Sequence, residues 1–449
     1  MPSTFPAAKP LLRSFQRSLQ HLRPALRALD VEAIARRSGF LRRRPRKVPM
    51  ADLALALVAA GSEAVLSLER VAHWIGLAAR TTYSKQALHK RLRPQIEPFL
   101  AELSSALFAS FLNPLRTRGW LASFKRVLLH DSTTHSLPKH LAQAFPGPRN
   151  ARNKTAATLK IQCVADLLQG ALLHLSLSGF TRNDQAASAD ILSLARAGDL
   201  ILRDLGYFSL AVLQRLQNLG AFFLTRWRRD LSLRDPDTGR VLELARCLRQ
   251  RGGFDGLVWV GEKRLPLRLV ALALPEEVAN LRRHRAKTNR DRRLKPSKES
   301  LFLMGWNIYL TNVPPTVWPA SVVARIYGLR WRVETIFKAW KSHLGLRELN
   351  CRSAQLLRLS ALSKLLFCAL MVGCCASLQA LCSAQRLVSL LRLARIVAKA
   401  SLTCNALLLG LSPQRCLQKD LQRHLFYESR PDRPNFCQHL RWANRHALG

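Results

Sequence analysis

The chain has 449 residues, enough for about three domains of roughly 150 residues each, and its 71 lysine and arginine residues against 28 acidic residues give a formal net charge of +43. Its hydrophobic fraction of 48% is that of a globular protein and excludes a disordered basic tail. So strong a positive field calls for a polyanion or an anionic membrane as partner, and arginine, whose guanidinium fork matches phosphate geometry, favours nucleic acid.

The first part of the chain is basic and interrupted by prolines, and we interpret residues 1–49 as a basic N-terminal arm. The arm contains no long apolar run, so the sequence predicts no secretory signal and a cytoplasmic protein. The lack of a secretory signal also suggests a reducing compartment. None of the ten cysteines has the CxxC or Cys/His spacing of a zinc site, so no zinc site is expected.

A helical region at residues 50–120 contains two short helices that are separated by a turn. The first is expected from Ser67 to Gly76 and the second from Ser84 to Leu92, because serine is a preferred N-cap and glycine a frequent stop. This pair resembles a helix-turn-helix, so we expect the region to bind DNA. An ordinary helical hairpin fits the pattern equally well.

Short β-strands follow in the next part of the chain. Alternating polarity or short apolar runs predict strands at residues 126–130, 158–165, 171–177, 199–203 and 222–225. The second and third of these are joined by a short loop, which predicts an antiparallel pair. A helix is expected at residues 186–197. Two of the strands stop at a carboxylate, Asp131 and Asp204.

Residues 226–320 are basic and rich in predicted strands, which are expected at residues 257–261, 266–274 and 306–311. The loop at residues 282–298 carries so many cations that we expect it to be mobile. A long helix should begin at about residue 321, and leucine-rich helices should fill residues 354–425. Residues 365–381 carry no charge, but a membrane span needs about 20 residues, so we interpret them as a buried core helix.

The most informative segment begins at Tyr327. On one continuous helix, which turns by about 100° per residue, five side chains fall within about 80° of one another. They are Tyr327, Arg330, Glu334, Lys338 and Lys341. One face would thus present a phenol, a guanidinium, a carboxylate and two ammonium groups. The alternative is a solvated helix face with ion pairs between residues four apart.

Asp131 and Asp204 supply two further carboxylates at predicted strand ends, where α/β sheets expose catalytic groups. A single aspartate in such a place is more often a turn former. Together with Glu334 the two offer the oxygen ligands that Mg²⁺ prefers. A pair of such ions can activate a nucleophile and stabilise the leaving oxygen of a phosphodiester, while neighbouring cations hold the phosphates.

At these residues the sequence resembles the DDE transposases of bacterial insertion sequences, in the insertion-sequence-four family with its Y-R-E-K signature. The matching motifs are His130-Asp-Ser-Thr-Thr, Asp204-Leu-Gly-Tyr-Phe and the helix Tyr327-x2-Arg-x3-Glu-x6-Lys. The resemblance covers about residues 50–430. The helical motif is highly specific, whereas each of the other two is short. One departure is Ser132, where many relatives have glycine.

The resemblance implies an α/β (α+β) fold, with a ribonuclease-H-like core around a mixed five-stranded sheet. Residues 121–225 and 321–352 would form this core, and residues 226–320 a strand-rich insertion. Helical regions would flank the core at residues 50–120 and 353–449. In relatives C-terminal helices pair two protomers, so residues 354–425 are the candidate assembly segment, unless they only cover the sheet.

The resemblance also implies an enzyme, a transposase that binds the terminal inverted repeats of an insertion sequence, cleaves the ends with two Mg²⁺ ions and joins them to target DNA. Mn²⁺ is an alternative ion. The implied metal ligands are Asp131, Asp204 and Glu334, and the implied DNA contacts are Tyr327, Arg330, Lys338, Lys341 and Trp306. The best-studied relatives have a tryptophan at the place of Trp306 that stacks on a flipped base, although a core aromatic fits equally well.

The implied partners are double-stranded DNA, as element ends and as target, and a second protomer, since pairing two ends requires at least a dimer. No membrane partner is expected, and the protein should act on the nucleoid in a bacterial cytoplasm. Alternatives from other classes are a catalytically silent DNA-binding protein, and a Mg²⁺ nuclease that does not transpose. A peripheral membrane protein ranks last because it does not account for the carboxylate triad.

Overall fold

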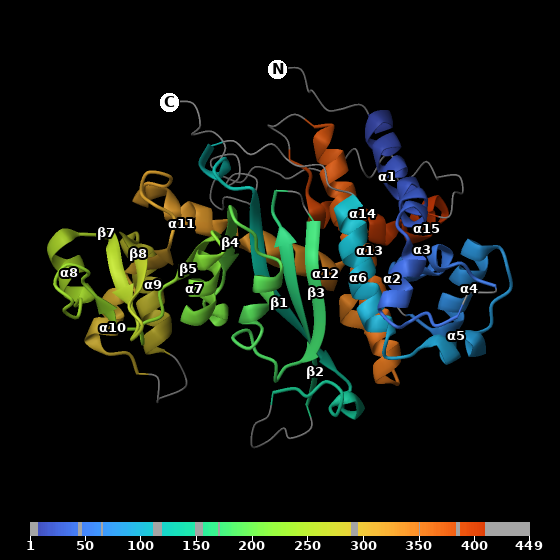
Figure 1. Cartoon of the computed structure of the whole chain (residues 1–449), viewed down its shortest axis with the longest axis horizontal. Coiled ribbons are helices and arrows are strands. Elements are labelled where there is room, and N and C mark those ends of the chain that lie inside the picture. The colour runs from blue at the N-terminus through green and yellow to red at the C-terminus, as the bar shows by residue number, and fades with distance from the viewer. Residues whose placement is uncertain are drawn as a thin grey trace. The chain divides into compact units, whose positions relative to one another are not determined.

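The computed structural model of the chain (Figure 1) describes residues 8–43, 47–63, 66–110, 119–148, 156–168, 171–288, 295–349, 351–382 and 387–408. These residues group into two compact units. Unit 1 contains the described residues of Met1–Arg116, Asp131–Asn183 and Trp331–Cys437, and unit 2 contains those of Thr117–His130 and Asp184–Arg330. The residues of the predicted core, 121–225 and 321–352, are divided between the two units. The predicted domain boundaries therefore remain predictions.

Unit 1 is mainly helical. Its strands are β2 (Ala157–Asp166), β3 (Ala171–Gly179) and the second half of β1 (Arg126–Leu137). Its helices are α1 (Ala8–Ala28), α2 (Val31–Arg37), α3 (Met50–Gly61), α4 (Leu68–Ala79), α5 (Lys85–Arg91), α6 (Ile96–Ser110), α12 (Trp331–Ser342), α13 (Ala354–Ala380), α14 (Leu390–Lys399) and α15 (Ser401–Leu408), with 3₁₀ turns η2 (Lys139–Leu141) and η6 (Leu346–Glu348).

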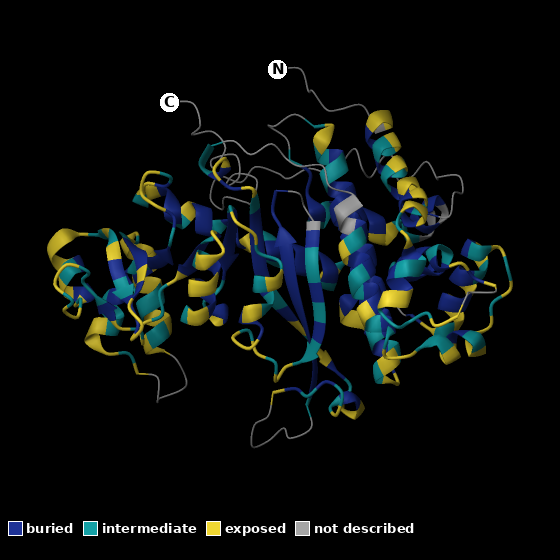
Figure 2. Cartoon of the chain, viewed as in Figure 1, coloured by how far each residue is buried: buried dark blue, intermediate teal, exposed yellow. Residues whose placement is uncertain are grey.

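Helix α1 replaces much of the predicted N-terminal arm. Leu11, Phe15 and Leu19 follow one another at intervals of four and are fully buried, whereas Arg13 and Arg17 are exposed. This spacing makes the helix amphipathic, and Figure 2 shows its exposed turns in yellow. Pro24 lies inside the helix without ending it. The buried apolar face therefore outweighs the proline signal, and this part of the arm is a packed helix.

Helices α4 and α5 confirm the predicted pair of short helices. Ser67 and Ser84 act as N-caps, and each side chain accepts a hydrogen bond from the backbone N–H three residues later, at 3.2 Å. The first helix continues past Gly76, contrary to the prediction, and its C-cap is Arg80 in the left-handed conformation with φ of 51°. Helix α5 packs against α4, as a helix-turn-helix or a helical hairpin requires.

Helix α13 forms the core of unit 1, where it packs against α1, α3, α6, α14 and β3. Among the described residues it is the one helix long and apolar enough to cross a membrane, and 94% of its most apolar 18-residue stretch is buried within the protein. This burial confirms the interpretation of residues 365–381 as a core helix. Gly61 at the end of α3 permits the close packing, because a Cβ there would lie 2.0 Å from the Ser363 carbonyl oxygen.

Unit 2 combines strands and shorter helices. Its strands are the first half of β1, then β4 (Asp199–Arg203), β5 (Phe222–Arg226), β6 (Leu233–Arg234), β7 (Phe254–Val260), β8 (Leu265–Ala273) and β9 (Trp306–Thr311). Its helices are α7 (Leu210–Asn218), α8 (Leu244–Arg251), α9 (Glu276–Lys287), α10 (Lys298–Leu303) and α11 (Ala320–Gly328), with 3₁₀ turns η1 (Gly119–Leu121), η3 (Ser188–Ser193) and η4 (Leu205–Tyr207).

The strands follow the order β3-β2-β1-β4-β5-β9-β8-β7-β6. The pairs β1/β4 and β4/β5 are parallel, while β2/β3 and β5/β9 are antiparallel. The five strands β3-β2-β1-β4-β5 form the mixed sheet of a ribonuclease-H-like core, and β1 contributes residues to both units. Strands β6 to β9 lie in the predicted insertion and extend this sheet through antiparallel pairs. The predicted fold class is therefore confirmed.

Two predicted elements are wrong. The expected helix at residues 186–197 is limited to the 3₁₀ turn η3. The expected loop at residues 282–298 begins instead as the last two turns of α9, and residues 289–294 lie outside the described part of the chain. Acidic Glu276 and Glu277 in the first turn of α9, and basic residues in its last turn, complement the helix dipole. This arrangement favours a helix in spite of the charge density.

Two predicted element ends also differ. Strand β1 continues through Asp131 to Leu137, although its pairing with β4 ends at His130. The single long helix expected from residue 321 is interrupted after Gly328, where the N–H groups of Leu329 and Arg330 bond to carbonyl groups three residues earlier. The break separates the phenol and guanidinium of the Y-R-E-K motif from its carboxylate and lysines, which lie on α12.

The contact between α3 and α13 gives a stability prediction. Gly61→Ala would place a methyl group within 2.0 Å of the Ser363 carbonyl oxygen, so the two helices must separate. We expect a loss of about 1–3 kcal/mol in stability, typical of overpacking, measured as a lower midpoint of thermal unfolding followed by circular dichroism.

The matched control is Gly253→Ala. The nearest atom to a Cβ at that position is the Ala271 carbonyl oxygen at 3.5 Å, an ordinary contact distance. This variant should unfold at the temperature of the parent protein. Equal midpoints for Gly61→Ala and the parent would contradict the packing of α13 against α3.

Candidate active site and cationic pocket

The predicted site residues divide between the two units. Unit 2 contains Asp204, Trp306, Tyr327 and Arg330, and unit 1 contains Asp131, Glu334, Lys338 and Lys341. Within the described residues of either unit, no three His, Cys, Asp or Glu side chains lie close enough together to hold a metal ion. The predicted triad draws on both units, so its convergence on a metal pair remains a prediction.

Asp204 directly follows β4, whose five residues are all buried. Its carbonyl oxygen accepts a hydrogen bond from the Tyr207 N–H at 3.1 Å, which begins the turn η4 and ends the strand. The Asp204 side chain is 47% exposed. A carboxylate that reaches solvent at the carboxyl end of a parallel strand lies where catalytic groups of α/β sheets are commonly found.

Two side chains at the end of α11 contact this carboxylate. The Tyr327 hydroxyl donates toward the Arg203 carbonyl oxygen at 3.3 Å and toward Asp204 Oδ1 at 3.4 Å. Arg330 Nη2 lies 3.8 Å from the same Oδ1. Among the described residues, the side-chain hydrogen bond and the ion pair of Asp204 both fall on Oδ1, which leaves Oδ2 for a cation.

Aromatic and cationic groups hold the Tyr327 ring. The guanidinium carbons of Arg226 and Arg330 lie 5.6 and 5.8 Å from its centre, and the Tyr309 ring lies at 5.2 Å. Burial raises the pKa of the Tyr327 hydroxyl to about 12, while Arg330 opposes the shift. The phenol therefore stays protonated at neutral pH and acts as a hydrogen-bond donor.

Arg203, the last residue of β4, fixes the turn that follows Asp204. Its Nη2 donates to the Tyr207 carbonyl oxygen at 2.6 Å and to the Ser188 hydroxyl. Burial lowers the pKa of this guanidinium to about 10, so it remains charged at neutral pH. The Tyr207 ring also packs on His130, with ring centres 4.1 Å apart. Tyr207 thus contacts the ends of two neighbouring strands, β4 through Arg203 and β1 through His130.

In unit 1, the backbone of the next residue restrains the Asp131 side chain. Its Oδ1 accepts a hydrogen bond from the Ser132 N–H at 2.8 Å. Because a main-chain group makes this contact, the serine supplies it as well as the glycine of many relatives would. Asp131 also lies near Cys163 of β2; burial raises the pKa of that thiol, and the carboxylate raises it further.

Helix α12 carries the remaining predicted residues. Glu334 lies in its first turn and is half-buried, Lys338 is exposed, and Lys341 lies in the last turn. Lys341 and Arg347 act on His135 of β1: burial lowers the pKa of His135, and the two cations lower it further. Burial and Arg347 also lower the pKa of Lys341. This end of the helix is therefore strongly electropositive.

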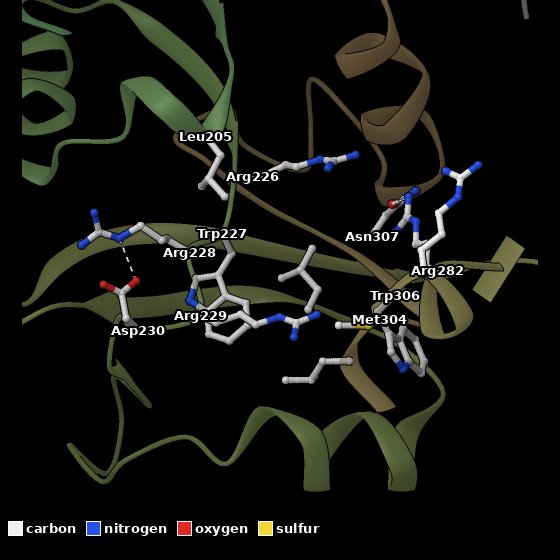
Figure 3. A pocket seen from close by; sticks show the side chains of 13 residues that line it. Leu205, Arg226, Trp227, Arg228, Arg229, Asp230, Arg282, Met304, Trp306 and Asn307 are labelled. Atoms are coloured by element: carbon white, nitrogen blue, oxygen red, sulfur yellow. Dashed lines mark hydrogen bonds and ion pairs between the residues drawn. The ribbon is translucent and has the colours of Figure 1, made fainter. Parts of the chain in front are cut away.

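A pocket of about 670 Å³ lies in unit 2 beside the turn that follows Asp204 (Figure 3). Five arginines from two segments of the chain line it: Arg226, Arg228, Arg229, Arg282 and Arg285. Trp227 and Trp306 add aromatic surface, and Leu205 connects the pocket to η4. The acidic residue in its lining is Asp230, which pairs with Arg228 at 2.7 Å.

This pocket suits a ligand that is both anionic and aromatic. Five guanidinium groups offer donors that match phosphate oxygens, and an indole offers a stacking surface for a base. Burial lowers the pKa of Arg229 and of Arg282, and Arg226 lowers that of Arg282 further. Arg282 donates to the Asn307 side chain at 3.1 Å, which positions its guanidinium at the start of β9.

Sequence reasoning singled out Trp306 but missed the five arginines. The signal for three of them was the run Arg226-Trp-Arg-Arg229, which directly follows a predicted strand. The sequence predicts a loop at Arg282 and Arg285, and a predicted loop does not indicate that both side chains line the same pocket as Arg226. Trp306 itself is partly buried and lines the pocket rather than the interior of the core.

A protein-family model described as a transposase DDE domain matches residues 122–372. The chain is 30% identical over 347 residues to the transposase for insertion sequence element IS231C of Bacillus thuringiensis subsp. berliner, which covers 72% of this chain and 71% of that protein. It is 26% identical over 337 residues to the transposase for insertion sequence element IS1151 of Clostridium perfringens, covering 70% and 71%. A solved piggyBac transposase synaptic complex with hairpin DNA aligns with a TM-score of 0.42 and 11% identity over 94% of this chain and 86% of that one.

The electropositive end of α12 gives a pH prediction. His135 should titrate below the ordinary value of 6.5, and Lys341→Met should raise its pKa toward that value by removing one repelling charge. Since the unfolded state binds the proton more readily, the free energy of unfolding should fall as the pH drops from 6.5 toward the folded-state pKa. NMR titration of the histidine ring protons, assigned with His135→Gln, measures the shift.

Lys338→Met is the matched control on the same helix. Lys338 acts on His343 and not on His135, so the His135 titration should be unchanged in this variant. A His135 pKa at or above 6.5 in the parent protein would contradict the arrangement.

Proposed function

The chain belongs to the DDE transposase family of bacterial insertion sequences, and we propose that it binds the terminal inverted repeats of its element, cleaves the DNA ends with two Mg²⁺ ions and joins them to target DNA. The observation that carries this proposal is that Asp131, Asp204 and Glu334 all lie within the matched range, residues 122–372. The reaction would take place on bacterial DNA in the cytoplasm.

We assign the metal ligands to these three carboxylates. Carboxylate oxygens are the donors that Mg²⁺ prefers, with waters and substrate phosphates completing its shell, and Mn²⁺ accepts the same ligands. Asp204 Oδ2 and the half-buried Glu334 fit such a role. Bound Mg²⁺ would activate the attacking hydroxyl and stabilise the leaving oxygen. Hydrogen bonds to Oδ1 restrain the carboxylates of Asp131 and Asp204, which would limit their rotation when a cation binds.

We assign the element end to the cationic pocket and to α12. The guanidiniums of the pocket would bind phosphates of the strand next to the cleaved bond, and Trp306 would stack on an unpaired base. Lys338 and Lys341 of α12 would hold further phosphates as point charges. These roles need accessible cations, and Arg226, Arg229, Arg285 and Lys338 are exposed.

We assign recognition of the repeat sequence to α4 and α5. Leu88 of α5 is buried, while Lys85, Gln86, His89 and Lys90 are exposed. Glutamine can bond to adenine and lysine to guanine in the major groove, which fits the second helix of a helix-turn-helix. If α4 and α5 were an ordinary helical hairpin, these four exposed side chains would have no DNA to bind.

At least two protomers should act together, since two ends must be paired. The expected assembly segment was residues 354–425, but α13 is buried within its own unit and has little surface left for a partner. Residues 409–425 lie outside the described part of the chain. We therefore propose dimerisation on DNA without assigning it to α13.

The first test of the function replaces one ligand isosterically. Asp131→Asn should lower cleavage of a duplex that carries the element's terminal repeat by at least about a hundredfold, because loss of a metal ligand costs more than loss of its supporting partner. Binding of the same duplex in EDTA should be unchanged. Gel assays of cleavage and joining, with fluorescence anisotropy for binding, measure both.

Asp235→Asn is the control, because Asp235 is a partly exposed turn residue of unit 2 that does not line the pocket, and its side chain bonds to the N–H groups of Asp237 and Thr238. It should cleave and join like the parent. Cleavage by Asp131→Asn near the parent rate would refute the metal assignment. Cleavage without joining by the parent would favour the nuclease alternative.

The second test concerns the pocket. Arg282→Ala should weaken binding of the end duplex. The slope of the logarithm of the binding constant against the logarithm of the salt concentration should become shallower by about 0.9, the value for one phosphate contact. Trp306→Ala should weaken binding by about 1–3 kcal/mol, as lost stacking does, with the salt dependence unchanged. Anisotropy titrations over a series of KCl concentrations in EDTA measure both quantities.

Arg215→Ala serves as the control, since Arg215 is exposed on α7 and does not line the pocket. Its affinity and salt dependence should match those of the parent. If Arg282→Ala and Arg215→Ala behave alike, the pocket does not bind the element end.

A further inference from the structure

Trp306, which lines the cationic pocket (Figure 3), is the first residue of β9 and follows a tight turn. The preceding helix, α10, ends at Leu303, and the Gly305 N–H donates to the Phe302 carbonyl oxygen at 3.0 Å. The Gly305 carbonyl oxygen accepts a hydrogen bond from the N–H of Leu274, just after β8, at 2.9 Å. Across this turn the ring centres of Phe302 and Trp306 lie 6.1 Å apart, with their planes at 50°. The main chain thus places the two aromatic side chains next to each other.

An arginine of α8 covers the Phe302 ring. The guanidinium carbon of Arg249 lies 4.5 Å from the centre of that ring, well within the range in which a cation is attracted to an aromatic face. Helix α8 packs against α10, and its Leu244 and Leu248 are buried while Arg249 in its last turn is exposed. Arg249, Phe302 and Trp306 therefore form one chain of contacts from the surface of α8 to the pocket.

This chain of contacts restrains the indole on which the proposed DNA contact depends. Aromatic pairs at such a distance and tilt attract each other, so Phe302 limits the orientations of the Trp306 ring, and Arg249 in turn holds Phe302. Arg249 itself does not line the pocket. A side chain that is held in its binding orientation loses less conformational freedom when a ligand binds, and the affinity is higher for that reason.

We propose that Arg249 and Phe302 are positioning residues that hold the Trp306 indole in the orientation in which it stacks on an unpaired DNA base. This inference rests on the proposed function, because it takes Trp306 to be a stacking surface for DNA. It gives α8 and α10 of the predicted insertion a part in binding the element end. The alternative for an exposed arginine at this place is a direct contact with a DNA phosphate, which has a different salt dependence.

The test combines Arg249→Ala with Trp306→Ala. In the parent background, Arg249→Ala should weaken binding of the terminal-repeat duplex in EDTA about twofold to fivefold, the range of one exposed cation–π contact. The slope of binding against salt should be unchanged, because no phosphate contact is lost. In the Trp306→Ala background, Arg249→Ala should cause no further loss, since residues that act through one another are not additive. Anisotropy titrations over a series of KCl concentrations measure both quantities.

Two further variants separate the contact from the charge. Phe302→Leu removes the ring without changing the charge of the protein, so it should weaken binding as Arg249→Ala does, and the two losses should not add. Arg246→Ala is the matched control, because Arg246 is exposed on the same helix and pairs with Glu243 at 3.9 Å. It should bind like the parent. Binding is measured at a temperature at which circular dichroism shows every variant to be folded.

The outcomes distinguish this inference from the function on which it rests. If Trp306→Ala weakens binding but Arg249→Ala and Phe302→Leu bind like the parent, the positioning role alone fails. A shallower salt slope for Arg249→Ala, with an equal loss in the Trp306→Ala background, would assign Arg249 to a phosphate and also overturn the inference. If Trp306→Ala binds the duplex like the parent, the stacking role within the proposed function fails, and the inference fails with it.

Discussion

Unit 2 depends on the hydrogen bonds that two buried guanidinium groups make to the chain around them. Arg203 and Arg268 are 2% and 5% exposed, and burial of a charge is costly unless hydrogen bonds or a counter-charge compensate for it. Arg268 pairs with Asp255 through two contacts of 2.6 Å and donates to the carbonyl groups of Val313 and Trp318. Arg203 similarly fixes the turn after Asp204. One guanidinium thus sets the end of β4, and the other the segment that leads into α11.

Local patterns predicted the strands of this fold well, because a half-buried strand leaves its alternation in the sequence. Strand β4 was predicted with its exact bounds, and β2 and β3 with their antiparallel pairing. Predictions failed where the tertiary environment decides. The buried face of α1 outweighs its proline, residues 186–197 form only a 3₁₀ turn, and the motif helix breaks after Gly328. Helical periodicity alone does not reveal a break that contains no proline.

For a similar reason, the sequence indicated some residues of the candidate site and not others. The three carboxylates stand in short motifs that a single sequence displays, and Asp204 lies at a strand end as expected. The predicted helix that carries both Tyr327 and Glu334 on one face is wrong, because Tyr327 lies on α11 and Glu334 on the separate helix α12. The pocket arginines come from segments more than fifty residues apart in the chain, and their proximity follows from the pairing of β5 with β9.

The crowding of five arginines around one pocket has a consequence for the solution in which the protein works. Like charges at close range repel one another, and one aspartate pairs with one of them. Any small anion that enters, such as inorganic phosphate or a free nucleotide, relieves that repulsion and occupies donors that DNA would use. The apparent affinity for DNA should therefore depend on the identity of the anions present, beyond the general screening that ionic strength provides.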